Sequence, residues 1–169
     1  NKLYTNFTSI SSSNEKFGYY GYLNYKIGDG FRDNSDFESI NTFQSLNFNL
    51  TDKSNLVTEI TYLKYLAHQA GGLSDRMFEL DPFQSNRERN WFEVDWLLYN
   101  LKYNYKISTN SNFSFNFFGL DAKRNALGFR TNRVDQIDYG EERDLIKGRF
   151  RNFGFESRYI NNYTFLKKK

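Results

Sequence analysis

The chain has 169 residues, a formal net charge of +3 and a mean hydropathy of -0.77, and 20% of its residues are aromatic. It contains no cysteine and only one histidine, His68, which argues against a disulfide-stapled scaffold and against a thiolate or His-rich metal site. No apolar run reaches the roughly 20 residues of a membrane-spanning helix, and the small net charge does not indicate nucleic-acid binding. A β-barrel stays possible, because polar lumen-facing residues lower the mean hydropathy of barrel strands.

Seven β-strands are predicted, separated by turn signals rich in Gly, Ser, Asn and Asp. They cover residues 2–10, 16–27, 37–50, 56–66, 91–107, 112–121 and 148–160. The connections 11–15, 51–55 and 108–111 are short, whereas 28–36, 67–90 and 122–147 are long and polar. If the strands are antiparallel neighbours, all the long connections lie at one end, an asymmetry typical of an outer-membrane barrel.

Apolar and polar residues alternate within these strands, as Phe113, Phe115 and Phe117 do with the polar residues between them. Such alternation fits a lipid face and a wet lumen, but it equally fits a soluble sheet with one buried face. The alternation changes phase near Leu97 and Leu98, which predicts either a β-bulge or a strand that continues beyond the bilayer. Seven strands are too few to close a membrane barrel, so we expect the native barrel to contain more protein than this chain.

Several segments of the chain resemble ferric-citrate-type TonB-dependent outer-membrane receptors, in the same order along the sequence. They include GDGFRDNS at 28–35, GGLS at 71–74, QSNRERNWF at 84–92 and FFGLDAKRNALGFRTNR at 117–133. The resemblance is clearest to Bacteroidetes-like members. It implies that residues 1–169 form about seven strands of an antiparallel 22-stranded transmembrane barrel, without the plug domain.

The resemblance also implies a location and partners. The protein would lie in the outer membrane of a Gram-negative bacterium, among outer-membrane lipid and lipopolysaccharide. It would import an anionic ferric chelate such as ferric citrate, with energy from the TonB-ExbB-ExbD system delivered through a plug region that this chain does not show. Iron would arrive already chelated, so no cofactor is expected.

Arginines are frequent in the two longest predicted loops, where Arg76, Arg87, Arg89, Arg124, Arg130, Arg133 and Arg143 lie. The planar guanidinium group binds carboxylates bidentately and stays charged, which suits a carboxylate-rich ferric chelate. In the resembling receptors, loop arginines contact the chelate. Motif position favours Arg87 and Arg124, followed by Arg89, with Arg130, Arg133 and Arg76 as further candidates. The alternative interpretation is that these arginines pair with loop carboxylates and only order the loops.

Other loop residues have simpler interpretations. Gly71 and its neighbour are expected to shape the second long loop, and Arg32 to form an ion pair with Asp33 or Asp36. His68 is expected to make a polar contact at the base of a loop. The sequence contains no nucleophile elbow, zinc-protease motif or phosphate-binding loop, so an enzyme is not expected.

Three other functions remain open on the sequence alone. One is TonB-dependent uptake of a glycan or vitamin, in which mouth aromatics would stack on the ligand. Another is a structural component of a larger outer-membrane assembly. The third is a soluble, aromatic-rich β-sandwich that acts as a binding module.

Overall fold

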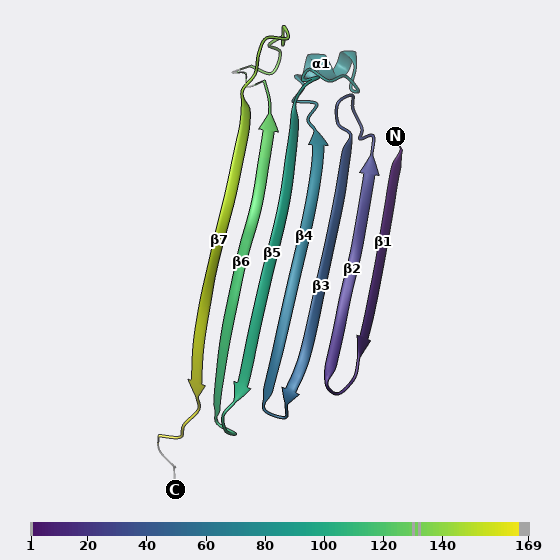
Figure 1. Cartoon of the computed structure of the whole chain (residues 1–169). Helices are drawn as coiled ribbons and strands as arrows, with labels where there is room; N and C mark the ends of the chain where they lie inside the picture. Colours follow the sequence, from purple (N-terminus) through teal and green to yellow (C-terminus); the bar gives the residue numbers. More distant parts are fainter. Residues whose placement is uncertain (1, 130, 132, 166–169) are drawn as a thin grey trace.

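The computed structural model describes residues 2–129, 131 and 133–165. Within these residues, seven antiparallel strands form one sheet in the order of the sequence, and each strand pairs with its neighbours along the chain (Figure 1). The strands are β1 (Leu3–Ser13), β2 (Phe17–Gly28), β3 (Phe37–Thr51), β4 (Ser54–His68), β5 (Trp91–Lys106), β6 (Ser111–Leu127) and β7 (Leu145–Asn161). The described part of the chain is therefore a simple up-and-down meander.

Short turns join the strands at one end of the sheet and long loops join them at the other, as the sequence predicted (Figure 1). The short turns are closed by side chains that replace missing backbone partners. The carboxamide oxygen of Asn14 accepts hydrogen bonds from the backbone N–H groups of Lys16 and Phe17 at 2.9 and 2.8 Å. The hydroxyl groups of Thr51 and Ser54 lie 2.7 Å apart across the next turn. Such side-chain turns explain why Asn, Ser and Thr mark these connections in the sequence.

The cross-strand pairs divide the side chains between two faces. One face, called here the belt face, carries an apolar band across all the strands from β2 to β7, represented by Phe48, Leu101 and Phe117. The opposite face, called here the polar face, carries mostly Asn, Ser, Lys and Glu at the same level, represented by Asn104 and Asn116. The period-two alternation predicted from the sequence therefore holds across the sheet.

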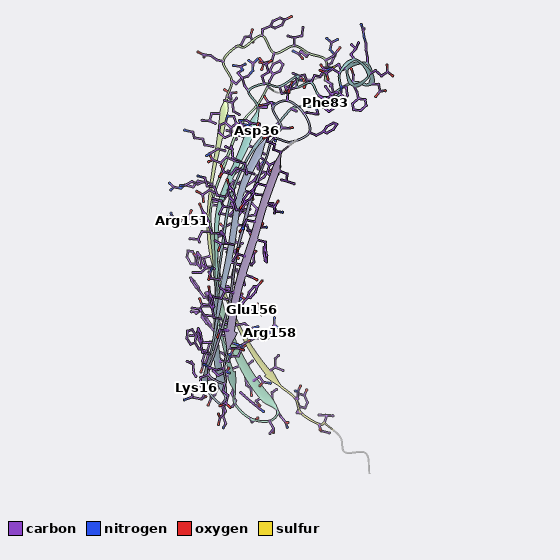
Figure 2. All side chains as sticks on the ribbon, turned by 90° about the vertical axis from the view of Figure 1, so that its right-hand side faces the viewer. Lys16, Asp36, Phe83, Arg151, Glu156 and Arg158 are labelled. Carbon is purple, nitrogen blue, oxygen red and sulfur yellow. The ribbon has the colours of Figure 1, made fainter. Side chains whose placement is uncertain are left out.

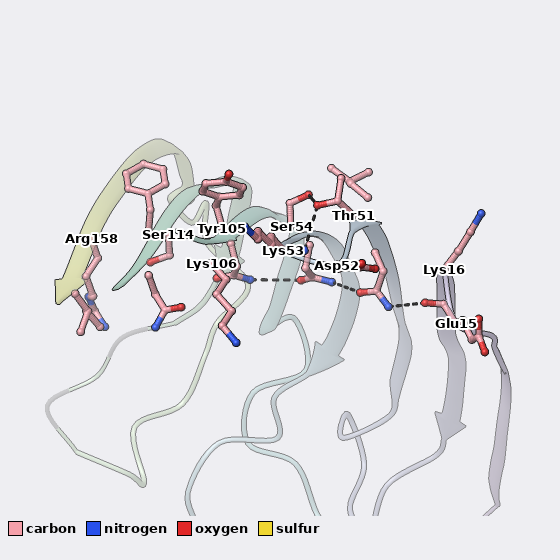
Figure 3. A pocket seen from close by; sticks show the side chains of 17 residues that line it. Glu15, Lys16, Thr51, Asp52, Lys53, Ser54, Tyr105, Lys106, Ser114 and Arg158 are labelled. Atoms are coloured by element: carbon pink, nitrogen blue, oxygen red, sulfur yellow. Dashed lines mark hydrogen bonds between the residues drawn. The ribbon is translucent and has the colours of Figure 1, made fainter. Parts of the chain in front are cut away.

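A hollow of about 850 Å³ lies mainly on the polar face, next to the short turns (Figure 3). Carboxamides line it in a connected row: Asn104 donates to Asn55 at 3.4 Å, Asn55 to Asn49 at 3.1 Å, and Asn49 to the Glu15 carbonyl at 2.8 Å. Arg158 lies at the far side of the same hollow. A polar lining of this kind is expected for the lumen side of a barrel segment.

Two sequence predictions about the long-loop end are wrong. β6 continues to Leu127 and does not end at Asp121, because it keeps pairing with both β5 and β7. The second difference is a six-residue helix, α1 (Asp75–Leu80), inside the predicted loop 67–90. Its N-cap is Ser74, whose hydroxyl accepts a hydrogen bond from the Met77 backbone N–H at 3.3 Å. No described helix has the length and hydropathy required to cross a membrane.

Of the two explanations predicted for the phase change near Leu97, the β-bulge is wrong, because β5 pairs with β4 and β6 without any register shift from one end to the other. The change in alternation has a different cause: the polarity of the two faces inverts towards the long loops. There the belt face carries Asp95 and Asp121, while the opposite face carries Val94 and Ala122, two of the few buried apolar residues. The strands continue unbroken through this region, and only the polarity of each face changes along them.

The boundary between the apolar band and the charged region runs obliquely across the sheet. The first charged belt-face residues above the band are Glu38, Lys64, Asp95, Asp121 and Arg151 on β3 to β7. The row of paired residues that contains Glu38 meets β7 at Lys147, four residues before Arg151. That offset is about 14 Å along the strand over about 19 Å of strand spacing, a slope of about 35°. Strands tilted by this amount relative to an apolar band are typical of a transmembrane barrel.

Candidate functional site: the loop cap

Three loops, 29–36, 69–90 and 128–144, lie together over the long-loop end of the sheet and form what we call the loop cap (Figure 1). Arg32 joins the first loop to the second. Its guanidinium donates to the carbonyl oxygens of Gln84 at 2.9 Å, Gly71 at 2.6 Å and Ala70 at 3.3 Å. The predicted ion pair of Arg32 with Asp33 or Asp36 is therefore wrong, because backbone carbonyls take its donors.

Gly71 has a positive φ of 77°, and a Cβ atom there would collide with Asn86 and Arg87. Only glycine has no Cβ to clash in this position, so the prediction that Gly71 shapes the loop is confirmed. Asn34, with φ of 53°, is a second left-handed residue. Its carboxamide nitrogen lies within hydrogen-bonding distance of the Arg87 and Asn90 carbonyls, at 3.3 Å for Asn90.

The base of the cap is held by polar contacts between neighbouring elements. His68 Nδ1 lies 2.8 Å from the Asp36 carboxylate, which confirms the predicted polar contact of this histidine. The buried carboxamide of Asn90 accepts a hydrogen bond from the Phe129 backbone N–H at 2.8 Å. These contacts connect the ends of β3, β4 and β5 with the third loop.

Arg87 is only 5% exposed, and its guanidinium is directed into the third loop. It donates to the Thr131 hydroxyl at 2.9 Å and to the carbonyls of Gln136 and Val134 at 3.2 and 3.4 Å. It also lies over the Phe129 ring, 5.1 Å from the centroid. Arg87 therefore orders the loops, and direct contact of Arg87 with a ligand stays a prediction.

Arg89 and Arg143 converge on the carboxylate of Asp138, at 2.8 and 2.6 Å. Arg143 also stacks on Phe129, 4.3 Å from the ring centroid. Burial alone would raise the pKa of the Asp138 carboxyl, but hydrogen bonds from Gly140 N–H and from both guanidinium groups hold that pKa below its usual value. This arrangement matches the alternative interpretation, in which loop arginines pair with loop carboxylates.

The remaining arginines face solvent in different parts of the cap. Arg124 lies on β6 and not in a loop, contrary to the prediction, and its guanidinium stacks on Phe92 at 5.2 Å from the ring centroid. Arg76 is an exposed residue of α1. Arg133, whose side chain is 76% exposed, makes a long 3.7 Å ion pair with Asp135. Arg130 lies outside the described residues.

The structure therefore separates the predicted site residues into two groups. Arg87 and Arg89 hold loops together, whereas Arg76, Arg124 and Arg133 keep guanidinium surface open to solvent. A hollow of about 380 Å³ between α1 and the third loop is lined by residues that include Arg89.

Sequence reasoning missed the residues that position these arginines: Asn34, Asn90, Phe129 and Asp138. The signal available for Asn34 was its place in a Gly- and Asp-rich turn, where Asn tolerates positive φ. The partners of the other three lie far away in the sequence. Within the described residues, no group of three or more His, Cys, Asp or Glu side chains is placed to hold a metal ion.

No protein-family model and no curated protein sequence matches the chain. Among solved structures, the chain is similar to the ferric citrate transporter FecA in its unliganded form, with a TM-score of 0.83 and 18% sequence identity. The match covers 96% of this chain but only 23% of the FecA chain. At this identity the match shows the fold and leaves the ligand open. The chain therefore has the fold of a seven-stranded segment of a TonB-dependent receptor barrel, which confirms the fold class predicted from the sequence.

Proposed function

We propose that this chain is part of an outer-membrane TonB-dependent receptor that takes up an anionic ferric chelate such as ferric citrate. The observation that carries the proposal is the fold match to the transporter FecA over 96% of the chain. The arginine-rich loop cap at the long-loop end supplies the chemistry for an anionic ligand.

The apolar band supports a membrane location for the sheet. On β5 the band extends from Leu97 to Tyr105 on the belt face. That length is about 27 Å along the strand, or about 22 Å at a tilt of about 35°, close to the roughly 25 Å apolar band of membrane barrels. A soluble sandwich would cover this face with a second sheet, yet Phe153 and Phe155 are 74% and 72% exposed.

Arg124 is the strongest candidate for direct contact with the chelate. It extends from a continuous strand that pairs on both sides, so its backbone position is fixed by the sheet. Its guanidinium lies over the Phe92 ring, and among the described residues it makes no hydrogen bond, so its N–H groups can bind carboxylate oxygens. Arg76 and Arg133 would add positive charge around the same entrance and attract an anion from solution.

The proposal is tested by ferric citrate binding to the natural full-length protein, purified in detergent. Arg124→Ala is expected to weaken binding about tenfold, the effect of losing one charge-assisted carboxylate contact. Arg124→Lys should recover only part of the loss, because an ammonium group lacks the bidentate geometry.

Lys102→Ala is the matched control, because Lys102 lies on the same face of the neighbouring strand. Val94 is the residue of β5 that pairs with Arg124. Lys102 lies eight residues beyond Val94, so it is about 27 Å further from the cap than Arg124 is. Removing this charge should leave the affinity unchanged. Equal affinity of Arg124→Ala and the natural protein would remove Arg124 from the site.

A neutral glycan is the second candidate ligand, because aromatic side chains cluster on the polar face. Tyr20, Tyr22 and Phe43 lie with ring centroids 5.9 to 6.3 Å apart, and Phe7 lies 5.4 Å from Tyr22. Sugars stack on such rings through their apolar faces. Binding of a neutral oligosaccharide that is insensitive to salt, without any binding of ferric citrate, would favour this function over iron uptake.

A further inference from the structure

The belt face of β7 changes from aromatic to basic within a few residues. Phe153 and Phe155 belong to the apolar band, and Lys147, Arg149 and Arg151 follow on the same face towards the loops. All three basic side chains are exposed, and same-face neighbours are about 7 Å apart along a strand. Figure 2 shows Arg151 on one side of the sheet and Arg158 on the other.

The basic side chains in this region outnumber the acidic side chains that pair with them. Arg151 pairs with Asp121 of β6 at 2.9 Å. Arg149 lies directly opposite Lys123, an arrangement of like charges that is unfavourable unless an anion is present. Asp95 on β5 is the other neighbour of Lys123. No ion pair of Lys123, Lys147 or Arg149 occurs among the described residues, so this part of the sheet has unpaired positive charge.

Positive charge on the belt face is confined to the long-loop side of the apolar band. Among the described strand residues, the belt-face Lys and Arg side chains are Lys64, Lys123, Lys147, Arg149 and Arg151. At the short-turn side, the belt-face residues of β7 and β4 are uncharged, for example Tyr159 and Ser54. A further strand beside β7 would pair with its edge and would not cover this face.

We infer that Lys123, Lys147, Arg149 and Arg151 bind the phosphate groups of a lipid in the adjoining membrane leaflet, with its acyl chains against Phe153 and Phe155. The inference rests on the membrane location in the proposed function. Cations directly above an apolar band lie at the level of the lipid headgroups. Phosphate oxygens accept two parallel hydrogen bonds from one arginine guanidinium. On the long-loop side the lipid would be a phosphorylated glycolipid of the lipid A class.

The test uses the natural full-length protein in detergent, titrated with bisphosphorylated lipid A and observed by native mass spectrometry. The triple variant Lys147→Gln, Arg149→Gln, Arg151→Gln should bind this lipid at least tenfold more weakly. A control variant of equal charge change, Lys16→Gln, Lys53→Gln, Lys106→Gln at the short-turn end, should bind it normally. Equal binding by the two triple variants would overturn the inference.

Two further ligands identify the source of the phosphate. Fully dephosphorylated lipid A should bind the natural protein no better than it binds the triple variant. Inorganic phosphate alone should not compete at millimolar concentration. Competition by inorganic phosphate would indicate a site for free anions and would overturn the lipid assignment.

Ferric citrate binding, measured on the same samples, separates this inference from the proposed function. The β7 triple variant should bind ferric citrate normally, and Arg124→Ala should bind lipid A normally. If the natural protein fails to bind ferric citrate while the triple variant loses lipid A, the lipid site stands and the proposed ligand is wrong. If chelate binding responds to Arg124 and lipid binding ignores β7, the opposite holds.

Discussion

Replacing Arg87 by alanine should release the third loop from the cap without unfolding the sheet. Arg87 makes three hydrogen bonds across the cap, to Thr131, Gln136 and Val134, and stacks on Phe129. Each hydrogen bond contributes a net of about 1 kcal/mol and the cation–π contact about 1 kcal/mol more. Part of this total offsets the cost of burying the charge, so we expect about 3 kcal/mol of loop docking free energy to be lost.

A loss of about 3 kcal/mol raises the population of the undocked loop by about two orders of magnitude. Hydrogen exchange followed by mass spectrometry measures this directly, because amides in a locally opening segment exchange through that opening. Peptides from 133–140 should exchange about a hundredfold faster in Arg87→Ala, whereas peptides from β5 and β6 should not change.

Arg133→Ala is the matched control, because Arg133 belongs to the same loop but is exposed and weakly paired with Asp135. It should alter exchange by less than about fivefold, which corresponds to the roughly 1 kcal/mol upper value for an exposed ion pair. Unchanged exchange in Arg87→Ala would refute the role of Arg87 as the tie between the loops. Faster exchange throughout β5 and β6 would show that the cap and the sheet open together.

Two further predictions concern the cap and the sheet. Because Asp138 has a lowered pKa, its ion pairs should stabilise loop docking fully above about pH 4 and lose that contribution as pH falls through the lower folded pKa. The protection factors of 133–144, which correct the exchange rates for the intrinsic pH dependence of amide exchange, should therefore fall in acid, and Asp138→Asn should remove this acid dependence; an identical profile of protection against pH in the variant would contradict the role of Asp138. A Cβ at Gly119 would collide with the Tyr99 ring lying over it, so Gly119→Ala should lower the unfolding free energy by about 1–2 kcal/mol. That loss, measured by denaturant titration, should largely disappear in a Tyr99→Ala background, and an equal loss in both backgrounds would place the cause elsewhere.

The sheet could be predicted from the sequence because its determinants are local. Alternation such as that of Phe113, Phe115 and Phe117 identifies a strand face, and Ser, Asn and Gly mark the turns. The end of β6 was predicted six residues too early, because Ala122, Lys123 and Arg124 have no period-two pattern of the expected phase. Paired neighbours on both sides keep these residues in the strand, and that is tertiary information.

The cap could be predicted only in composition. The sequence indicated that arginines are concentrated in the cap. Which of these arginines are buried depends on hydrogen-bond acceptors far away in the sequence. The guanidinium of Arg87 donates hydrogen bonds to acceptors in a loop more than 40 residues later in the sequence, and that of Arg32 donates to carbonyls of the second loop. A guanidinium group has the same sequence signature whether it binds a carbonyl, a carboxylate or a ligand.

The inversion of polarity along β5 and β6 places the candidate site relative to the membrane. On β6 the apolar band ends below Asp121, the first charged residue of the belt face, and Arg124 lies three residues further towards the loops. Three residues are about 10 Å along the strand, and Arg124 lies opposite Gly148, between Arg149 and Lys147. On the proposed membrane location Arg124 is therefore above the apolar band, at the level of the lipid headgroups. At that height the belt face of the sheet is charged, as expected if it meets water and headgroups in the proposed location. The opposite face carries apolar residues there: Val94 and Ala122 are buried, and Ala122 lies between the larger cross-strand neighbours Trp96 and Phe150. A chelate that approaches from outside would therefore meet Arg124 before it reaches the level of the apolar band.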